Sequence, residues 1–116
     1  MEETKKILQN DVWMVDIGYR GIVGHEQKGK RPFYVISNDT YNQNSKTPIG
    51  YFISTSEKKK TNRYVLEIDV DGTTEYVNVS QIRTLSEERF LYKMGNCNNK
   101  ILLKLQEIFL KNIIEE

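Results

Sequence analysis

The chain has 116 residues, of which 17 are lysine or arginine and 16 are aspartate or glutamate, so its formal net charge is +1. This length predicts a single domain over residues 1–116 and excludes a two-lobed enzyme or a repeat array. A net charge near zero excludes a histone-like polycation. Residues 1–63 nevertheless carry 11 basic and 7 acidic side chains, which permits a modest positive face for nucleic acid.

The chain has one cysteine, Cys97, and one histidine, His25. This composition excludes an intramolecular disulfide and a cysteine-rich zinc site, so we expect no metal and no cofactor. No apolar stretch approaches the roughly 18 residues that cross a bilayer, and the N-terminal residues lack the order of a signal peptide. We therefore expect a cytoplasmic protein without membrane contact.

Five short runs rich in β-branched and aromatic residues predict strands. These runs cover residues 11–17, 31–37, 49–54, 63–68 and 74–79. Residues 38–45 have the composition of a turn, and four glycines between residues 18 and 29 predict a loop before the second strand. The pattern indicates a small, strongly curved antiparallel sheet.

The hydrophobic period changes near the C-terminus. Leu102, Leu105, Phe109 and Ile113 recur at spacings of three and four residues, which predicts an amphipathic helix over about residues 98–114. An asparagine at position 98 or 99 suits its N-cap. The sequence thus predicts a mainly β (α+β) fold with one C-terminal helix.

Chemistry-bearing side chains gather around the glycine-rich loop. Arg31 stands at the start of a predicted strand, and its planar guanidinium matches phosphate oxygens and could stabilise charge that develops on a phosphorane. An ordinary surface ion pair is the alternative. The imidazole of His25 could transfer a proton, or it could be a solvated loop side chain.

A second group of polar side chains follows the third predicted strand. The hydroxyls of Ser54 and Thr55 could bind phosphate or orient a reacting oxygen, although such residues also cap turns. Lys58 to Lys60, with Lys28 and Lys30, could form the rim of a phosphate-binding groove, or simply a solvated face. Cleavage of RNA through its own 2′-hydroxyl needs only positioning, proton transfer and positive charge.

Several motifs occur in an order that resembles one protein family. The segment Gly-His-Glu-Gln-Lys-Gly-Lys-Arg-Pro at residues 24–32 is the most specific, and residues 12–16, 35–42 and 81–84 accompany it. Over about residues 9–114 the chain resembles the MazF/PemK (Kid) ribonucleases of type II toxin–antitoxin systems. The resemblance implies an SH3-like barrel of the CcdB/MazF/PemK toxin type with a C-terminal helix, assembled as a homodimer.

The resemblance also implies an activity and partners. Such a protein would be an mRNA interferase, a metal-independent endoribonuclease that cleaves single-stranded RNA at a short sequence, leaves a 2′,3′-cyclic phosphate and a 5′-hydroxyl, and arrests growth. A cognate antitoxin of the MazE/PemI type would cover an RNA groove at or near the dimer interface.

The family's functional residues carry over onto matching positions. Arg31 matches the catalytic arginine, Ser54 stands where MazF members usually have a catalytic threonine, and His25 matches the Kid branch. By the same analogy, the RNA site would be lined by Glu26, Gln27, Lys28, Asn42 and Gln81. The Kid branch has an arginine and an aspartate where this chain has Asn78 and Ser80, so Arg31 with Ser54 is the favoured catalytic pair.

Two other functions are compatible with the same barrel. One is a non-catalytic toxin like the gyrase-binding CcdB, but the tryptophan of that family's C-terminal helix end is missing here. The other is an inactive barrel that serves as a binding module. The intact Arg31 argues against an inactive barrel, whereas the serine at position 54 leaves it open.

Overall fold

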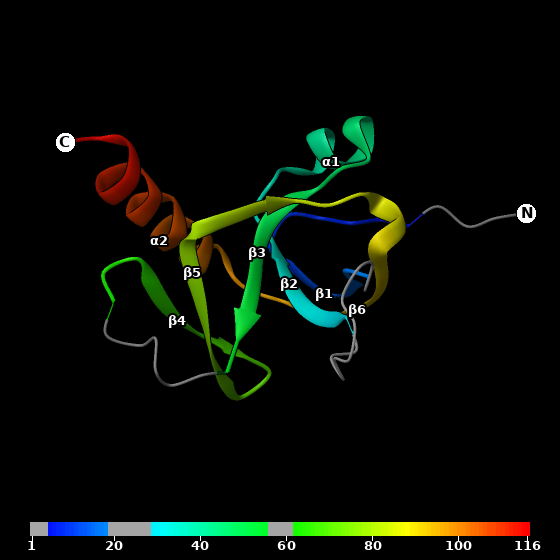
Figure 1. Ribbon diagram of the computed structural model, residues 1–116, viewed down its shortest axis with the longest axis horizontal. Coiled ribbons are helices and arrows are strands. Elements are labelled where there is room, and N and C mark those ends of the chain that lie inside the picture. Colours follow the sequence, from blue (N-terminus) through cyan, green and yellow to red (C-terminus); the bar gives the residue numbers. More distant parts are fainter. Residues whose placement is uncertain (1–4, 19–28, 56–61) are drawn as a thin grey trace, which may run out of the picture.

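The computed structural model describes residues 5–18, 29–55 and 62–116, which form a six-stranded sheet and a C-terminal helix (Figure 1). All neighbouring strands are antiparallel, and their order is β4-β5-β3-β2-β1-β6. The strands are β1 (Asp11–Asp16), β2 (Lys30–Val35), β3 (Ile49–Ser54), β4 (Val65–Val70), β5 (Thr73–Thr84) and β6 (Phe90–Asn96). The predicted mainly β fold with a C-terminal helix is therefore confirmed.

The central strands bury both of their faces, because successive side chains of a strand point to opposite sides. On one side Tyr34 packs in a cluster with residues of β1, β3, β4 and β5 and with Leu105 of the C-terminal helix. On the other side Phe33 and Val35 pack with Trp13 and Phe90. The sheet is thus held by two apolar clusters, and β2 contributes to both.

The C-terminal helix α2 spans Asn99–Phe109 and continues as the π-helical segment η3, Leu110–Ile114. Its first turn is capped by Asn98, whose side-chain oxygen accepts a hydrogen bond from the Ile101 backbone N–H at 3.2 Å. Leu102 and Leu105 are its buried residues. The predicted cap is therefore confirmed, and so is the first part of the predicted apolar face, whereas Ile113 at its end is exposed.

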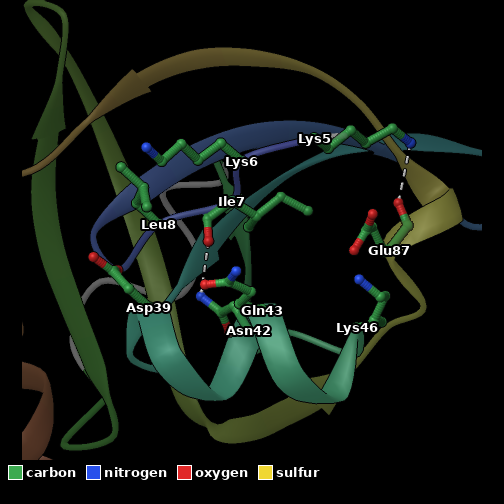
Figure 2. Close-up of a pocket in the computed structure, with 9 residues that line it drawn as sticks. All are labelled: Lys5, Lys6, Ile7, Leu8, Asp39, Asn42, Gln43, Lys46 and Glu87. Carbon is green, nitrogen blue, oxygen red and sulfur yellow. Dashed lines mark hydrogen bonds between the residues drawn. The ribbon is translucent and has the colours of Figure 1, made fainter. Parts of the chain in front are cut away.

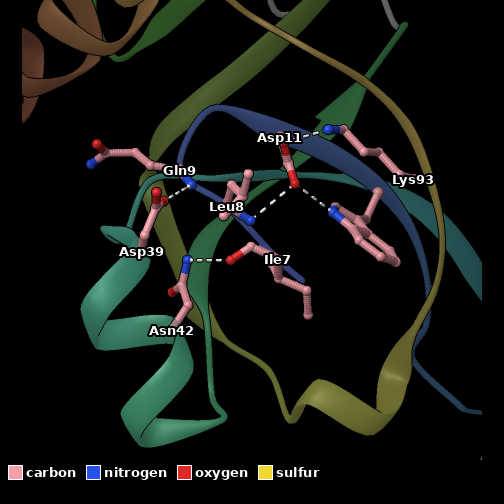
Figure 3. Close-up of polar contacts among 8 residues, drawn as sticks. Ile7, Leu8, Gln9, Asp11, Asp39, Asn42 and Lys93 are labelled. Carbon is pink, nitrogen blue, oxygen red and sulfur yellow. Dashed lines mark hydrogen bonds and ion pairs between the residues drawn. The ribbon is translucent and has the colours of Figure 1, made fainter. Parts of the chain in front are cut away.

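Residues 38–45, predicted to be a turn, form instead the short helix α1, Asp39–Ser45. Its residues are poor helix formers, but tertiary hydrogen bonds hold it (Figure 3). The Asn42 amide donates to the Ile7 carbonyl at 3.1 Å and to the Ser37 carbonyl at 3.1 Å. Asn38 caps the helix start by accepting from the Tyr41 backbone N–H.

Strand β6 has no counterpart among the predicted elements. It follows the 3-10 turn η2 (Glu87–Arg89) and pairs with β1, with two shifts of register. The buried carboxylate of Asp11 accepts from the Trp13 indole N–H at 3.0 Å and lies 3.2 Å from the Lys93 ammonium (Figure 3). This ion pair links β6 to the edge of the sheet that β1 would otherwise form.

Strands β2 and β3 approach each other very closely at Gly50. A Cβ atom added there would lie 1.8 Å from the Tyr34 carbonyl oxygen and 2.9 Å from a carbon of the Phe33 ring. Only a residue without a side chain fits at this position. The close pairing of β2 and β3 therefore depends on Gly50.

Candidate active site

A shallow pocket of about 30 Å³ lies where β2 begins, β3 ends and β5 changes direction. Because β2 and β3 are antiparallel, the start of one and the end of the other meet at the same edge of the sheet. The pocket is lined by Arg31, Phe52, Ser54, Val65, Tyr76, Asn78 and Gln81.

The strand register explains why Arg31 and Ser54 meet. Phe33 pairs with Phe52, and continuing this antiparallel register by two residues places Arg31 across from Ser54. All four side chains belong to one face of the sheet, because they alternate with residues of the opposite face. Ser54 in turn pairs with Tyr76 of β5, which extends the row across a third strand.

An irregularity in β5 brings its polar residues to the pocket. Tyr51 pairs with Ile82 and Ile53 pairs with Val77, so residues 78–81 bulge from the ladder opposite Phe52. The Asn78 side-chain oxygen accepts hydrogen bonds from the Ser80 backbone N–H at 3.0 Å and from the Ser80 hydroxyl at 2.7 Å. Figure 1 shows the resulting change of direction along β5.

Two arginine side chains contact the Phe52 ring. The Arg31 Cζ atom lies 4.6 Å from the ring centroid, and the Arg83 Cζ atom lies 5.6 Å from it. Phe33 packs edge-on against the same ring, with centroids 5.3 Å apart. The Phe52 ring is thus packed against Phe33 and makes cation–π contacts with two guanidinium groups.

The Arg31 side chain is half-buried, and its surroundings destabilise its charge. Desolvation and then the nearby charge of Arg83 lower the pKa of Arg31. Within the described part of the chain, the ion pairs are Lys93 with Asp11 and Lys111 with Glu107. Neither pair involves Arg31, so no carboxylate of the described residues is paired with its charge.

Some of the predicted site residues meet in this pocket and others do not. The pocket includes Arg31, Ser54 and Gln81. Lys30 and Thr55 are exposed next to it along β2 and after β3, and do not line it. The predicted His25, Glu26, Gln27, Lys28 and Lys58 lie outside the described residues.

Asn42, also predicted to line the RNA site, lies elsewhere. Only 3% of it is exposed, and it borders a larger pocket of about 380 Å³ between α1 and the N-terminal segment (Figure 2). Its amide is engaged with Ile7 and Ser37, and its side-chain oxygen accepts from the Ser37 hydroxyl. The structure does not bring Asn42 to Arg31, and gives it a role in holding α1 to the N-terminal segment.

The sequence did not single out Phe52 and Arg83 as site residues, although Arg83 belongs to a motif noted above. Alternation provides a signal for Phe52, because it lies two residues before Ser54 and so shares its face. Arg83 has no such signal. Its proximity depends on the bulge in β5, which the predicted strand of residues 74–79 did not include.

Across residues 5–18, 29–55 and 62–116, no group of three or more histidine, cysteine, aspartate or glutamate side chains is arranged to hold a metal ion. None of the helices in these ranges has the length and apolar character needed to traverse a bilayer.

Comparison with known proteins gives consistent matches. Residues 8–113 match the sequence model of a family described as PemK-like, MazF-like toxin of type II toxin–antitoxin system. The chain is 30% identical over 105 residues to Endoribonuclease EndoA of Bacillus subtilis (strain 168), which covers 87% of this chain and 89% of the relative.

Solved structures show the same fold at lower identity. A mycobacterial endoribonuclease in complex with its cognate antitoxin matches with a TM-score of 0.74 and 18% identity, over 95% of this chain and 99% of that one. MazF from Deinococcus radiodurans matches with a TM-score of 0.74 and 16% identity, over 95% of this chain and 98% of that one.

Proposed function

Because this chain belongs to the family of PemK-like, MazF-like toxins of type II toxin–antitoxin systems, we propose that it is an endoribonuclease that cleaves single-stranded RNA at the Arg31 pocket. The observation that carries this proposal is the half-buried Arg31 guanidinium, which shares a pocket with Ser54 and has no carboxylate partner among the described residues. Curated relatives include a named endoribonuclease.

The proposed reaction uses the substrate's own nucleophile. The RNA 2′-oxygen attacks the adjacent phosphorus, the bond from phosphorus to the 5′-oxygen breaks, and the products are a 2′,3′-cyclic phosphate and a 5′-hydroxyl. The 2′-hydroxyl loses a proton and the leaving 5′-oxygen gains one. Metal ions are not required, because positioning and fixed positive charge supply the stabilisation.

Four polar residues of the pocket have a task in this scheme. The Arg31 fork donates to the non-bridging oxygens of the scissile phosphate, where negative charge increases in the transition state. The Ser54 hydroxyl lies across from it and donates to the same phosphate. Gln81 and Asn78, placed by the bulge in β5, offer amide groups to the bases or sugars. Proton transfer by His25 stays a prediction.

The partners follow from the family. We propose a homodimer that acts in the cytoplasm, whose activity is blocked when a cognate antitoxin covers the RNA groove. A mycobacterial neighbour is described as bound to its cognate antitoxin. That likeness supports the same arrangement here.

The test is incubation of the purified chain with long RNA in EDTA, followed by mapping of the new ends. We expect cleavage at a short recurring sequence, with 5′-hydroxyl ends that polynucleotide kinase can label directly. A folded chain that leaves RNA intact would contradict the proposal and favour a non-catalytic toxin or a binding module. New ends that carry a 5′-phosphate would contradict the 2′-hydroxyl mechanism.

A further inference from the structure

The Arg83 side chain lies beside the proposed active site without lining its pocket. Arg83 follows the bulge in β5 and pairs with Gly50 of β3. The Arg83 Cζ atom lies 5.6 Å from the centroid of the Phe52 ring, and Phe52 lines the pocket. Arg83 therefore contacts a pocket residue without being part of the pocket lining.

The charge of Arg83 is exposed and has no carboxylate partner among the described residues. The Arg31 Cζ atom lies 4.6 Å from the centroid of the same ring. The charge of Arg83 contributes to lowering the pKa of Arg31. Two like charges held close together without a counterion destabilise each other. A bound polyanion would relieve this repulsion at both groups.

We propose that Arg83 is a second phosphate contact of the site, which holds the RNA phosphate next to the one bound by Arg31. The inference rests on the proposed function, because it takes RNA as the ligand. Single-stranded RNA carries one phosphate per nucleotide, so a strand with its scissile phosphate on Arg31 presents a neighbouring phosphate nearby. The neighbouring phosphate does not react, so Arg83 is a positioning residue.

A contact to a non-reacting phosphate has a distinct signature. It stabilises the bound substrate and the transition state equally, so its loss raises KM and leaves kcat unchanged. It also releases counterions, so its loss makes binding less dependent on salt, by about 0.7 in the slope of log affinity against log salt for a single strand. A residue with only a structural role would leave that slope unchanged.

The experiment compares Arg83→Gln and Arg83→Lys with the wild-type chain. Affinity for a 2′-O-methyl RNA oligonucleotide, which cannot be cleaved, is measured between 50 and 300 mM salt, and KM and kcat are measured on cleavable RNA. We expect Arg83→Gln to weaken binding about tenfold and to reduce the salt slope. Arg83→Lys should keep the slope and lose only part of the affinity, because lysine keeps the charge without the fork. Lys104→Ala, which removes an exposed charge on α2, is the matched control and should change neither value.

The outcomes separate this inference from the proposed function. An Arg83→Gln variant with wild-type affinity and wild-type slope would overturn the inference, even if the wild-type chain cleaves RNA as proposed. A fall in kcat with unchanged KM would also overturn it, because Arg83 would then act on the reacting phosphate or on the fold. A wild-type chain that binds the oligonucleotide through Arg83 but leaves RNA intact would overturn only the proposed function.

Discussion

The Arg31 pocket and the pocket beside α1 differ in size and in how their polar groups are used. The larger one, about 380 Å³, lies between α1 and the N-terminal segment. There the Lys5 ammonium donates to the Glu87 carbonyl at 3.1 Å and the Asn42 amide donates to the Ile7 carbonyl at 3.1 Å (Figure 2). Asp39 accepts from the Gln9 backbone N–H at 2.8 Å (Figure 3). The smaller one, about 30 Å³, is lined by Arg31, whose charge has no carboxylate partner among the described residues.

This difference shows that volume and chemistry need not coincide. The larger hollow results from packing a short helix against an extended segment, and hydrogen bonds across it hold the two together. The smaller pocket is lined by the half-buried, partly desolvated guanidinium of Arg31, which has no carboxylate partner among the described residues. The proposal of the smaller pocket as the active site therefore rests on an available charged group and not on size.

The largest effect is expected from Arg31→Ala. Loss of one preorganised donor to the transition state lowers the rate by at least ~100-fold, whereas the lost contact with Phe52 costs only about 1 kcal/mol of stability. Single-turnover cleavage of RNA at saturating protein measures the cleavage rate, and thermal unfolding measures the change in stability. Lys6→Ala, which removes a charge from the larger pocket, is the control and should cleave at the wild-type rate.

Equal activity of the Arg31→Ala and wild-type chains would remove the chemical distinction between the two pockets. A strong loss of activity in Lys6→Ala would reverse it, and would make the larger pocket the candidate for RNA cleavage.

The next effect in size is expected from Asn42→Ala, and it concerns stability. The substitution leaves the Ile7 and Ser37 carbonyls without their donor, which lowers the free energy of unfolding by about 2 kcal/mol. Urea unfolding measures this value, and kcat of the folded variant should stay unchanged. Gln43→Ala, an exposed neighbour that lines the same pocket, should stay within about 0.5 kcal/mol. If Asn42→Ala abolished cleavage in a fully folded chain, Asn42 would contact RNA after all.

A smaller effect is expected from Ser54→Ala. Removal of one hydroxyl donor to the phosphate lowers kcat about tenfold. Ser54→Thr keeps the hydroxyl and should retain most of the activity. The ratio of the two variants' rates, measured on the same RNA, isolates the hydroxyl. Equal rates for alanine and threonine would remove Ser54 from the proposed mechanism.

Five strands and the C-terminal helix were predictable, because the strands are short runs of β-branched and aromatic residues and the helix repeats apolar residues at spacings of three and four. The element β6 was not, because Leu91, Tyr92 and Met94 are all exposed and the strand pairs with β1 through two register shifts. The helix α1 was also not predicted, because its residues have weak helix propensity and the hydrogen bonds of Asn42 to distant residues stabilise it.

The site was predictable in part. Arg31 and Ser54 could be named from motifs, and the strand register brings them together as the resemblance implied. The bulge at residues 78–81 could not be predicted, because nothing in the sequence marks where β5 leaves its ladder. Consequently the sequence could not predict that Arg83 lies beside Phe52, although it shows that position 83 is a basic residue.

Gly50 has a consequence for how toxicity can be lost. A side chain there would force the backbones of β2 and β3 apart at Tyr34, and the displacement would pass along both strands to their shared edge, where Arg31 and Ser54 face each other. An allele altered only at position 50 would therefore encode every chemical group of the pocket and still be harmless to its host, since the groups would no longer converge on one phosphate.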